Sequence, residues 1–211
     1  MRPSVRPAGL LYVEVDCPPE LESEFHAWYN LEHIPERLKI SGFVTGRRYA
    51  ALEGSPRWLA TYELTAVDVL DSAEYRQWLG GPLQTAWTTR MLASTRIHRS
   101  VFRLAAHAEA AASPERQSGL LAVRFEVAVS ERGQLNHWHD REFSPALLEI
   151  GGVASAARYE NTEGTEQLCL YGLEQPWVVQ NERFARVWGA GWDARRSALA
   201  SYKRTLFIGI L

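Results

Sequence analysis

An internal repeat limits the possible folds of this chain more than any other feature of its sequence. The run Gly9–Leu11 returns as Gly119–Leu121, at an offset of 110 residues. The same offset then pairs identical residues without a gap: Trp28 with Trp138, Glu32 with Glu142, Pro35 with Pro145, Leu38 with Leu148, Ile40 with Ile150, Gly42 with Gly152, and Arg48-Tyr49 with Arg158-Tyr159. The chain is therefore predicted to contain two copies of one unit.

A one-residue deletion changes the offset to 109 in the later part of the repeat. It brings Tyr62 onto Tyr171, Leu64 onto Leu173, Tyr75 onto Phe184, Gly80 onto Gly189 and Ile97 onto Leu206. Between the copies, the run AAHAEAAASPERQS has no apolar periodicity and is rich in Ala, Ser, Glu and Pro, which is typical of a linker. We predict a first repeat at residues 1–104, a linker at 105–118 and a second, degenerate repeat at 119–211.

Each copy shows the same order of hydrophobic patterns. An alternating run (LLYVEV or LLAVRFEVAV) predicts a strand. An amphipathic segment over about 20–38 or 133–148 predicts a helix, and a glycine at 42 or 152 follows its end. Two further strands, a second helix from about residue 71 and a last strand complete the unit, with a GSP turn at 54–56 in the first copy. This βαββαβ order is that of a ferredoxin-like fold.

A single ferredoxin-like sheet has helices on one face only, so its other apolar face needs a cover. The second copy can supply that cover. We therefore predict an α+β chain in which two βαββαβ repeats form an intramolecular pseudo-dimeric α+β barrel. The chain has eight Trp, eight Tyr and seven Phe, and aromatic side chains between two such sheets would line a cavity for a flat, apolar small molecule.

Charge and composition exclude several functions. The formal net charge is −2, which provides no basic field for nucleic acid or for an anionic membrane. No stretch approaches the roughly 20 apolar residues that span a bilayer, so a cytoplasmic location is expected. Cys17 and Cys169 are too few and too distant in sequence for a disulfide framework or a CxxC metal site. The repeat itself predicts a monomer with pseudo-twofold symmetry, or a homodimer of such chains.

The segment WYNLEHIPERLKISGFVTGRRY, followed by RWLATYEL and PLQTAWTTRM, resembles the EthD-like members of the dimeric α/β-barrel superfamily. The resemblance covers nearly all of residues 9–104 and, in a weaker form, 119–211. It implies that this chain builds alone a barrel that its relatives build from two chains. That superfamily includes isomerases, polyketide cyclases, quinone-forming monooxygenases without an organic cofactor, and proteins of unproved activity, so the fold leaves the reaction open.

The resemblance also implies site residues. The family's characteristic His falls on His33, within EHIP, and its Arg-Tyr pair falls on Arg48 and Tyr49. The second copy has Phe143 in place of His33. The sequence therefore leaves open whether one or both copies hold an active site.

Residues kept in both copies are more easily explained by the shared architecture, and residues kept in one copy are better site candidates. Trp28 and Pro35 are accordingly interpreted as packing and helix-end residues, and Tyr62 is a weaker candidate than His33. Glu32 is expected to face the sheet and to pair with Arg48, as Glu142 with Arg158. The alternative is a catalytic carboxylate in one copy.

His33 leads the functional candidates because imidazole can move a proton near neutral pH without a cofactor. Tyr29 precedes it by four residues and can share its helix face. His139 aligns with Tyr29 and is therefore a substrate-binding candidate in the second copy. It lies beside His137, but a spacing of two places these histidines on different faces of a helix, so no metal site is expected. The remaining substrate-binding candidates are large aromatic residues, each of which is alternatively plain core: Tyr49, Trp58, Trp78, Trp87, Trp188 and Trp192.

The leading hypothesis is a cofactor-independent enzyme that isomerises, cyclises or dehydrates a small hydrophobic, cyclic or aromatic or polyketide-like metabolite. His33 would be the acid-base, Tyr29 and Tyr62 would orient an enolate-like oxygen, and Arg48 would stabilise its charge. One alternative is a cofactor-free, quinone-forming monooxygenase, and another is a noncatalytic small-molecule binding protein. The sequence contains no GxGxxG motif, Walker loop or GxSxG elbow, so it gives no support for a nucleotide cofactor or a serine-hydrolase mechanism.

Overall fold

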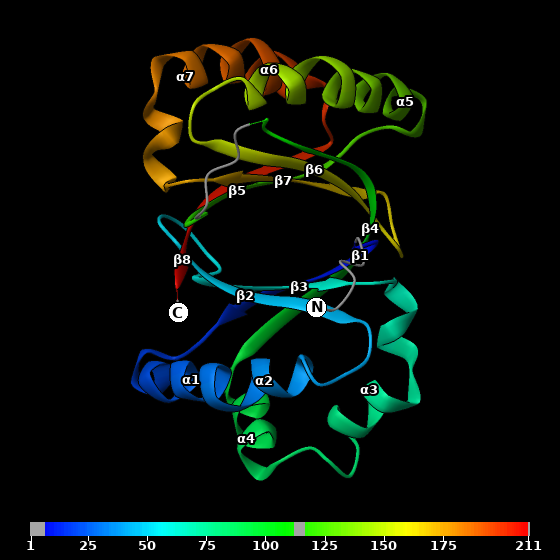
Figure 1. Ribbon diagram of the computed structural model, residues 1–211, viewed down its shortest axis with the longest axis vertical. Coiled ribbons are helices and arrows are strands. Elements are labelled where there is room, and N and C mark those ends of the chain that lie inside the picture. Colours follow the sequence, from blue (N-terminus) through cyan, green and yellow to red (C-terminus); the bar gives the residue numbers. More distant parts are fainter. Residues whose placement is uncertain (1–6, 112–116, 211) are drawn as a thin grey trace. The chain divides into compact units, whose positions relative to one another are not determined.

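The computed structural model describes residues 7–111 and 117–210 (Figure 1). The chain divides into two compact units between Arg103 and Leu104. Each unit has the predicted strand–helix–strand–strand–helix–strand order, and helices cover one face of its antiparallel sheet. No helix in these ranges is both long enough and apolar enough to cross a membrane.

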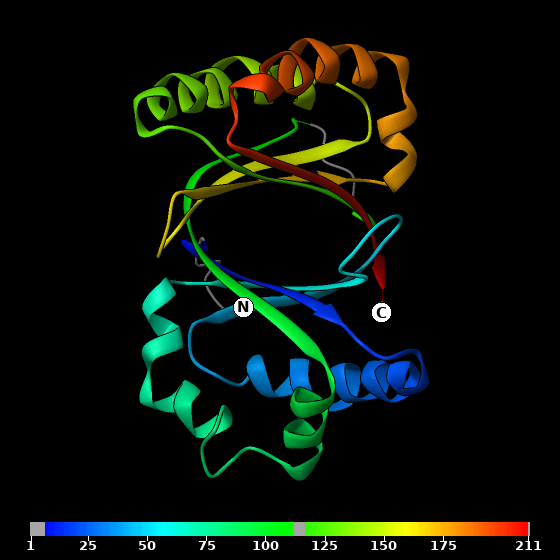
Figure 2. The ribbon, with the colours of Figure 1, turned by 180° about the vertical axis from the view of Figure 1, so that it is seen from behind.

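Unit 1 has the strand order β4-β1-β3-β2, with α1 and α2 against the sheet and α4 leading into β4 (Figure 2). Strand β1 lies between β3 and β4, and both pairings are antiparallel. The elements are β1 (Gly9–Asp16), η1 (Pro19–Leu21), α1 (Glu22–Trp28), η2 (Tyr29–His33), α2 (Ile34–Arg37), β2 (Phe43–Ala51), β3 (Trp58–Leu64), η3 (Val67–Asp71), α3 (Ala73–Trp78), α4 (Ala86–Ser94) and β4 (Arg96–Glu109).

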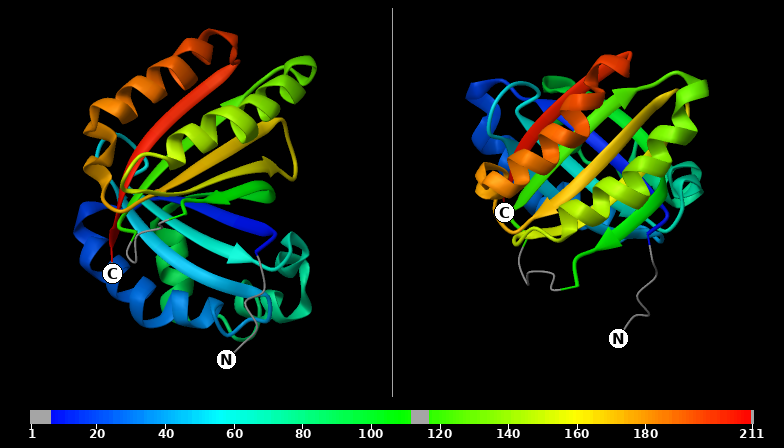
Figure 3. Two further views of the ribbon diagram at one scale, coloured as in Figure 1. Left: turned by 45° about the horizontal axis from the view of Figure 1, so that its top comes forward. Right: turned by 90° about the horizontal axis from the view of Figure 1, so that it is seen from above.

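Unit 2 has the equivalent order β8-β5-β7-β6, and its two helical segments lie over the same face of this sheet (Figure 3). The elements are β5 (Gly119–Glu126), α5 (Val129–Trp138), η4 (His139–Phe143), α6 (Ser144–Leu148), β6 (Val153–Asn161), β7 (Glu166–Leu173), η5 (Pro176–Gln180), α7 (Glu182–Trp188), η6 (Gly189–Asp193), η7 (Arg196–Ala198) and β8 (Ser201–Ile210).

The first helical segment of each unit contains one wide turn. Residues 29–33 in unit 1 and 139–143 in unit 2 form a π-helical turn within an otherwise α-helical segment. Such turns are rare and occur often at functional sites. The segment ends at Gly42 or Gly152, which have φ of 96° and 89°, a conformation that favours glycine. The glycine signal in the sequence therefore marks the helix ends correctly.

The last strands differ from the sequence alignment. Val15 pairs with Ile97 in unit 1, whereas the equivalent Phe125 pairs with Tyr202 in unit 2. The structural offset of these strands is thus 105 residues, and the predicted match of Ile97 with Leu206 is wrong. The cause is the connection before the strand: in unit 1 a loop separates α3 from the nine-residue helix α4, whereas in unit 2 the helical segment continues unbroken from α7 through η6 to η7.

The linker is shorter than the composition suggests. Strand β4 continues to Glu109, so residues 105–109 of the predicted linker are strand. These alanine-rich residues alternate between half-buried and exposed positions. Residues 112–116 of the predicted linker lie outside the described part of the chain.

Candidate functional site

A small cavity lies within unit 1, between its helices and its sheet. Its free volume is about 40 Å³, enough for a water molecule or two. Three of the four residues predicted to act in catalysis, Tyr29, His33 and Tyr62, meet here, on the helix side of the sheet and not on the face expected to line the barrel cavity. The lining residues are Leu11, Val13, Trp28, Tyr29, His33, Arg37, Tyr62, Tyr75, Leu79, Leu92, Ile97 and Arg99.

Three side chains of this lining carry buried polar atoms that have no hydrogen-bond partner in the described part of the chain. Nδ1 of His33, the hydroxyl of Tyr62 and both terminal nitrogens of Arg37 are buried and make no hydrogen bond within residues 7–111 and 117–210. Arg37 is only 2% exposed. An unpaired buried polar group lowers the free energy of unfolding by about 1–3 kcal/mol, and a charged one lowers it more. These groups therefore destabilise the fold.

Local structure brings these groups together. The wide turn of η2 carries both Tyr29 and His33, with ring centroids 5.1 Å apart. Arg37 follows His33 by one helical turn. Tyr62 projects from β3 toward the helices, and its ring centroid lies 6.4 Å from that of His33. From β4, Arg99 donates a hydrogen bond of 2.6 Å to the hydroxyl of Tyr75.

The electrostatics of the cavity favour neutral His33 and protonated tyrosines. Burial, followed by the positive charges of Arg37, Arg99 and Arg48, holds the pKa of His33 well below its usual value. Burial raises the pKa of Tyr62 well above its usual value and that of Tyr29 to about 12. At neutral pH the cavity therefore contains an uncharged imidazole beside the Arg37 guanidinium, whose carbon lies 5.4 Å from the centroid of the Tyr75 ring and whose terminal nitrogens make no hydrogen bond within the described residues.

Arg48 lies behind Tyr29 and outside the cavity lining. Its guanidinium carbon is 4.6 Å from the centroid of the Tyr29 ring. It donates a hydrogen bond of 2.8 Å to Asn30 and contacts Nδ1 of His26 at 2.7 Å. The expected pairing with Glu32 is therefore wrong, as is its counterpart in unit 2, where Arg158 binds Asp140 and Glu160.

Glu32 instead accepts hydrogen bonds from two threonine hydroxyls at the start of α4. Thr85 donates to it at 2.5 Å and Thr88 at 2.9 Å, and the indole nitrogen of Trp28 donates to the Thr88 hydroxyl at 3.0 Å. Thr88 is fully buried. These bonds fasten α4 to the first helical segment, so the role of Glu32 is structural.

Glu32→Ala is expected to lower the free energy of unfolding by about 1–3 kcal/mol, because it leaves the buried Thr88 hydroxyl without its acceptor. Glu142→Ala, at the equivalent exposed position in unit 2, should change it by less than about 0.5 kcal/mol. Urea denaturation of both variants measures the difference. Equal losses would contradict the assignment.

Unit 2 holds a fully hydrogen-bonded network where unit 1 has unpaired groups. Nδ1 of His139 lies 2.8 Å from Asp140, and its Nε2 lies 2.9 Å from the hydroxyl of Tyr171. Arg158 binds both carboxylate oxygens of Asp140, and Trp192 donates to the Tyr171 hydroxyl at 2.9 Å. His139 was predicted to contact substrate. It is 2% exposed and belongs to this closed network.

Apolar side chains fill the part of unit 2 that corresponds to the unit 1 cavity. Phe143 takes the position of His33, Leu147 that of Arg37, and Trp188 that of Leu79. All three belong to the buried core cluster of unit 2. Packing is tight, since the ring of Phe143 lies directly against Gly191. Trp188 is therefore a core residue, and the cavity with the unpaired groups is in unit 1.

The other predicted aromatic contacts lie away from the cavity. Tyr49 follows Arg48 on β2 and so projects from the opposite face of the sheet. Trp58 packs on His26, with ring centroids 4.5 Å apart. Trp78 lies beneath Lys39, whose Nζ is 5.7 Å from its ring. Trp87 donates a hydrogen bond of 2.9 Å to Glu24, which also pairs with Arg90.

Comparisons with known proteins bear on the fold. No protein-family model matches the sequence, and no curated protein matches it. A solved structure of an anthrone oxidase-like protein, 11% identical, covers 99% of this chain and 93% of its own, with a TM-score of 0.67. The fold is that of ferredoxin-like α+β barrel proteins. The predicted fold class is thereby confirmed.

Two further α+β barrel structures match over nearly the whole chain. A mutant chlorite dismutase from Candidatus Nitrospira defluvii in complex with cyanide is 10% identical, covers 97% of this chain and 91% of its own, and has a TM-score of 0.63. A monooxygenase-like protein from Listeria innocua is 7% identical, covers 98% and 96%, and has a TM-score of 0.54. At these identities the similarity establishes the fold alone.

The two buried histidines predict a pH dependence of stability. Burial lowers the pKa of both His33 and His139 below 6.5, so the unfolded chain takes up protons that the folded chain does not. The free energy of unfolding should be constant above about pH 7.5 and fall below pH 6.5, by up to about 1.4 kcal/mol per pH unit for each histidine. Urea titrations at pH 7.5 and 5.5 measure this loss. No loss over this interval would contradict the burial of neutral imidazoles.

Proposed function

We propose that the protein is an enzyme that transfers a proton on a small cyclic or aromatic metabolite in the unit 1 cavity. One observation carries the proposal: His33, Arg37 and Tyr62 place unpaired, buried polar atoms in the lining of one cavity. Such groups destabilise a fold unless a ligand satisfies them. An imidazole, a guanidinium and a phenol together match a reaction that removes a proton and leaves an oxyanion.

Each group has a role in this proposal. Neutral His33 takes a proton from a carbon next to a carbonyl, or from a phenol, and the electron pair moves onto the oxygen. Arg37 and the Tyr62 hydroxyl donate hydrogen bonds to that oxygen. Tyr29 holds the ring of His33 in place, and Arg48 acts as a positioning residue through its contact with Tyr29. In an isomerase His33 returns the proton at another carbon.

The charges around His33 connect substrate binding with its basicity. In the free protein, Arg37, Arg99 and Arg48 lower its pKa in addition to burial. A substrate that carries or develops negative charge beside Arg37 offsets these cations, so the pKa of His33 rises toward neutrality in the complex. The imidazole then becomes a stronger base when substrate is bound.

The cavity must widen to accept such a substrate. Its volume of about 40 Å³ is far below the roughly 300–1,000 Å³ of typical ligand pockets. Leu79, Leu92 and Ile97 in the lining are only partly buried, and Leu79 ends α3, next to the loop that precedes α4. Displacement of these side chains enlarges the cavity without moving the sheet that carries Tyr62.

A cofactor-free monooxygenase is the second candidate. The names of two matched structures, the anthrone oxidase-like and the monooxygenase-like proteins, favour it. The first step is the same, because removal of a proton by His33 produces an electron-rich enolate or phenolate. In this alternative that anion is oxidised by dioxygen, which is reduced in turn, and no isomer is released.

A substrate panel of small phenols, anthrones and unsaturated lactones tests the proposal. Each compound is incubated in D2O, proton exchange is followed by NMR, and oxygen is followed with an electrode. Exchange or isomerisation that requires His33 supports proton transfer, and oxygen uptake selects the monooxygenase. A compound that binds but is recovered unchanged and unexchanged, with wild type and His33→Ala alike, would establish a noncatalytic binding protein.

A further inference from the structure

In unit 1, two side chains of the first helical segment hold a single hydroxyl group between them. The indole nitrogen of Trp28 donates to the hydroxyl oxygen of Thr88, and the same hydroxyl donates to the carboxylate of Glu32. A Trp and a Glu one helical turn apart thus act together as a receptor for a hydroxyl. Trp87, which precedes Thr88 on α4, donates a hydrogen bond to Glu24, which lies one helical turn before Trp28 on α1.

Unit 2 keeps this receptor but not its occupant. Trp138 and Glu142 stand at the positions of Trp28 and Glu32, and Gln134 stands at that of Glu24. In unit 2 the second helical segment runs without a break from α7 through η6 to η7, and within residues 117–210 none of its side chains is hydrogen-bonded to Trp138 or Glu142. The indole nitrogen of Trp138 and the carboxylate of Glu142 make no hydrogen bond within residues 7–111 and 117–210.

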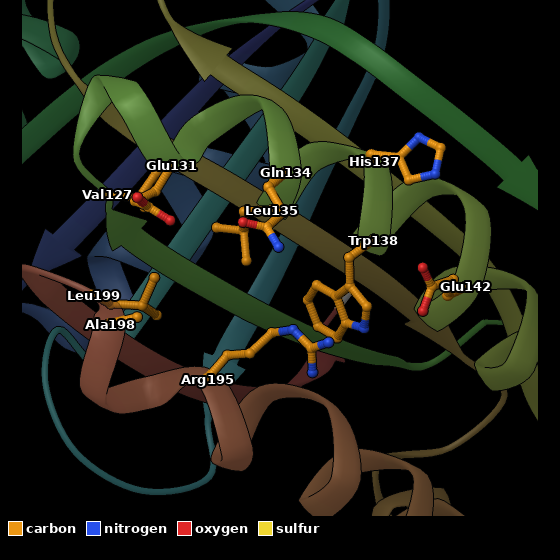
Figure 4. A pocket seen from close by; sticks show the side chains of 10 residues that line it. All are labelled: Val127, Glu131, Gln134, Leu135, His137, Trp138, Glu142, Arg195, Ala198 and Leu199. Atoms are coloured by element: carbon orange, nitrogen blue, oxygen red, sulfur yellow. The ribbon is translucent and has the colours of Figure 1, made fainter.

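A groove of about 360 Å³ opens at this place (Figure 4). Figure 4 shows the nitrogen edge of the Trp138 indole turned toward the side of Glu142, with Arg195 across the groove. The guanidinium carbon of Arg195 lies 4.0 Å from the centroid of the Trp138 ring. The volume is within the range of small-molecule pockets. Trp138, Glu142 and Arg195 lie in its lining, together with the apolar side chains of Val127, Leu135 and Leu199.

We propose that this groove binds a small alcohol with an apolar body, and that Trp138 and Glu142 recognise its hydroxyl. An indole nitrogen only donates and a carboxylate only accepts. The group between them must therefore accept and donate at once, which a hydroxyl does and an ether, a carboxylate or an ammonium does not. Val127, Leu135 and Leu199 provide apolar contact for the rest of the molecule.

Cyclohexanol and methoxycyclohexane form a matched pair of probes, because they differ in the donated hydrogen. The readout is the indole N–H signal of Trp138 in a ¹H–¹⁵N NMR spectrum of the whole chain, assigned with Trp138→Phe. Cyclohexanol should shift this signal saturably, with a dissociation constant in the range of about 1–10 mM expected for so small a ligand. Methoxycyclohexane should bind at least about tenfold more weakly.

Glu142→Ala removes the acceptor at an exposed position and should weaken cyclohexanol binding at least about tenfold. Glu163→Ala, an exposed carboxylate in the β6–β7 turn, is the matched control and should leave it unchanged. No saturable shift, equal affinity for the ether, or full binding by Glu142→Ala would overturn the proposal. The test does not involve the unit 1 cavity, so its outcome is independent of the proposed enzymatic activity.

Discussion

His33→Phe is expected to abolish proton transfer and to leave the protein folded. The loss in turnover should be about 10²–10⁴-fold, the usual contribution of a positioned acid-base group. Phenylalanine already occupies the equivalent position in unit 2, as buried Phe143, so this helix accepts it. The free energy of unfolding should stay the same or rise by about 1 kcal/mol, because the substitution removes an unpaired buried nitrogen.

The pH dependence provides a readout that a packing defect would not reproduce. His33→Phe should remove one of the two histidine contributions to the loss of stability below pH 6.5. His98→Phe, at an exposed position on β4, serves as the control and should leave turnover within about twofold. If His33→Phe kept full turnover on a compound that the wild type converts, another group would have to be the base.

Arg37→Leu is expected to make the protein more stable and less active. Leu147 stands at the equivalent position in unit 2 and is completely buried. Replacing a buried guanidinium whose terminal nitrogens are unpaired with an apolar side chain should raise the free energy of unfolding by about 1–4 kcal/mol. Loss of the cation that faces the developing oxyanion should lower kcat/KM about 10²–10³-fold. Thermal unfolding and steady-state kinetics measure the two effects.

Opposite signs in stability and activity identify a group retained for function. Arg76→Leu, on the exposed side of α3, is the matched control and should change neither quantity strongly. Arg37→Lys separates charge from geometry, since lysine keeps the charge but not the planar fork. A less stable Arg37→Leu protein would mean that the guanidinium supports the fold, and it would remove Arg37 from the proposed mechanism.

The repeat and the hydrophobic patterns were sufficient for the order of strands and helices. They depend on local features such as alternation in β1 and the glycine after the first helical segment, which the structure retains at Gly42 and Gly152. They failed at the last strand, where pairing with β1 or β5 sets the register. Two apolar strand sequences can be aligned almost equally well in several registers. Only the pairing of each strand with its neighbour in the sheet shows which residues are equivalent.

The site was predicted in part. Comparison of the two copies selected His33, and the same comparison would have selected Arg37, whose counterpart is Leu147. Arg37 was missed because a charged residue near a helix end is usually exposed. Arg99 could not have been found in this way, since its structural counterpart is Arg204. The neighbours of Arg48 were also beyond reach, because they depend on which helix face meets the sheet.

The polar cavity of unit 1 and the apolar core at the corresponding place in unit 2 allow a division of labour within one chain. A protein built from two identical subunits must place any costly polar group in both copies. Here the core of unit 2 has Phe143 and Leu147 in place of His33 and Arg37, so these two polar groups burden unit 1 alone. Substitutions that adapt the cavity to a new substrate can therefore accumulate in unit 1, while the core of unit 2 keeps its contribution to stability.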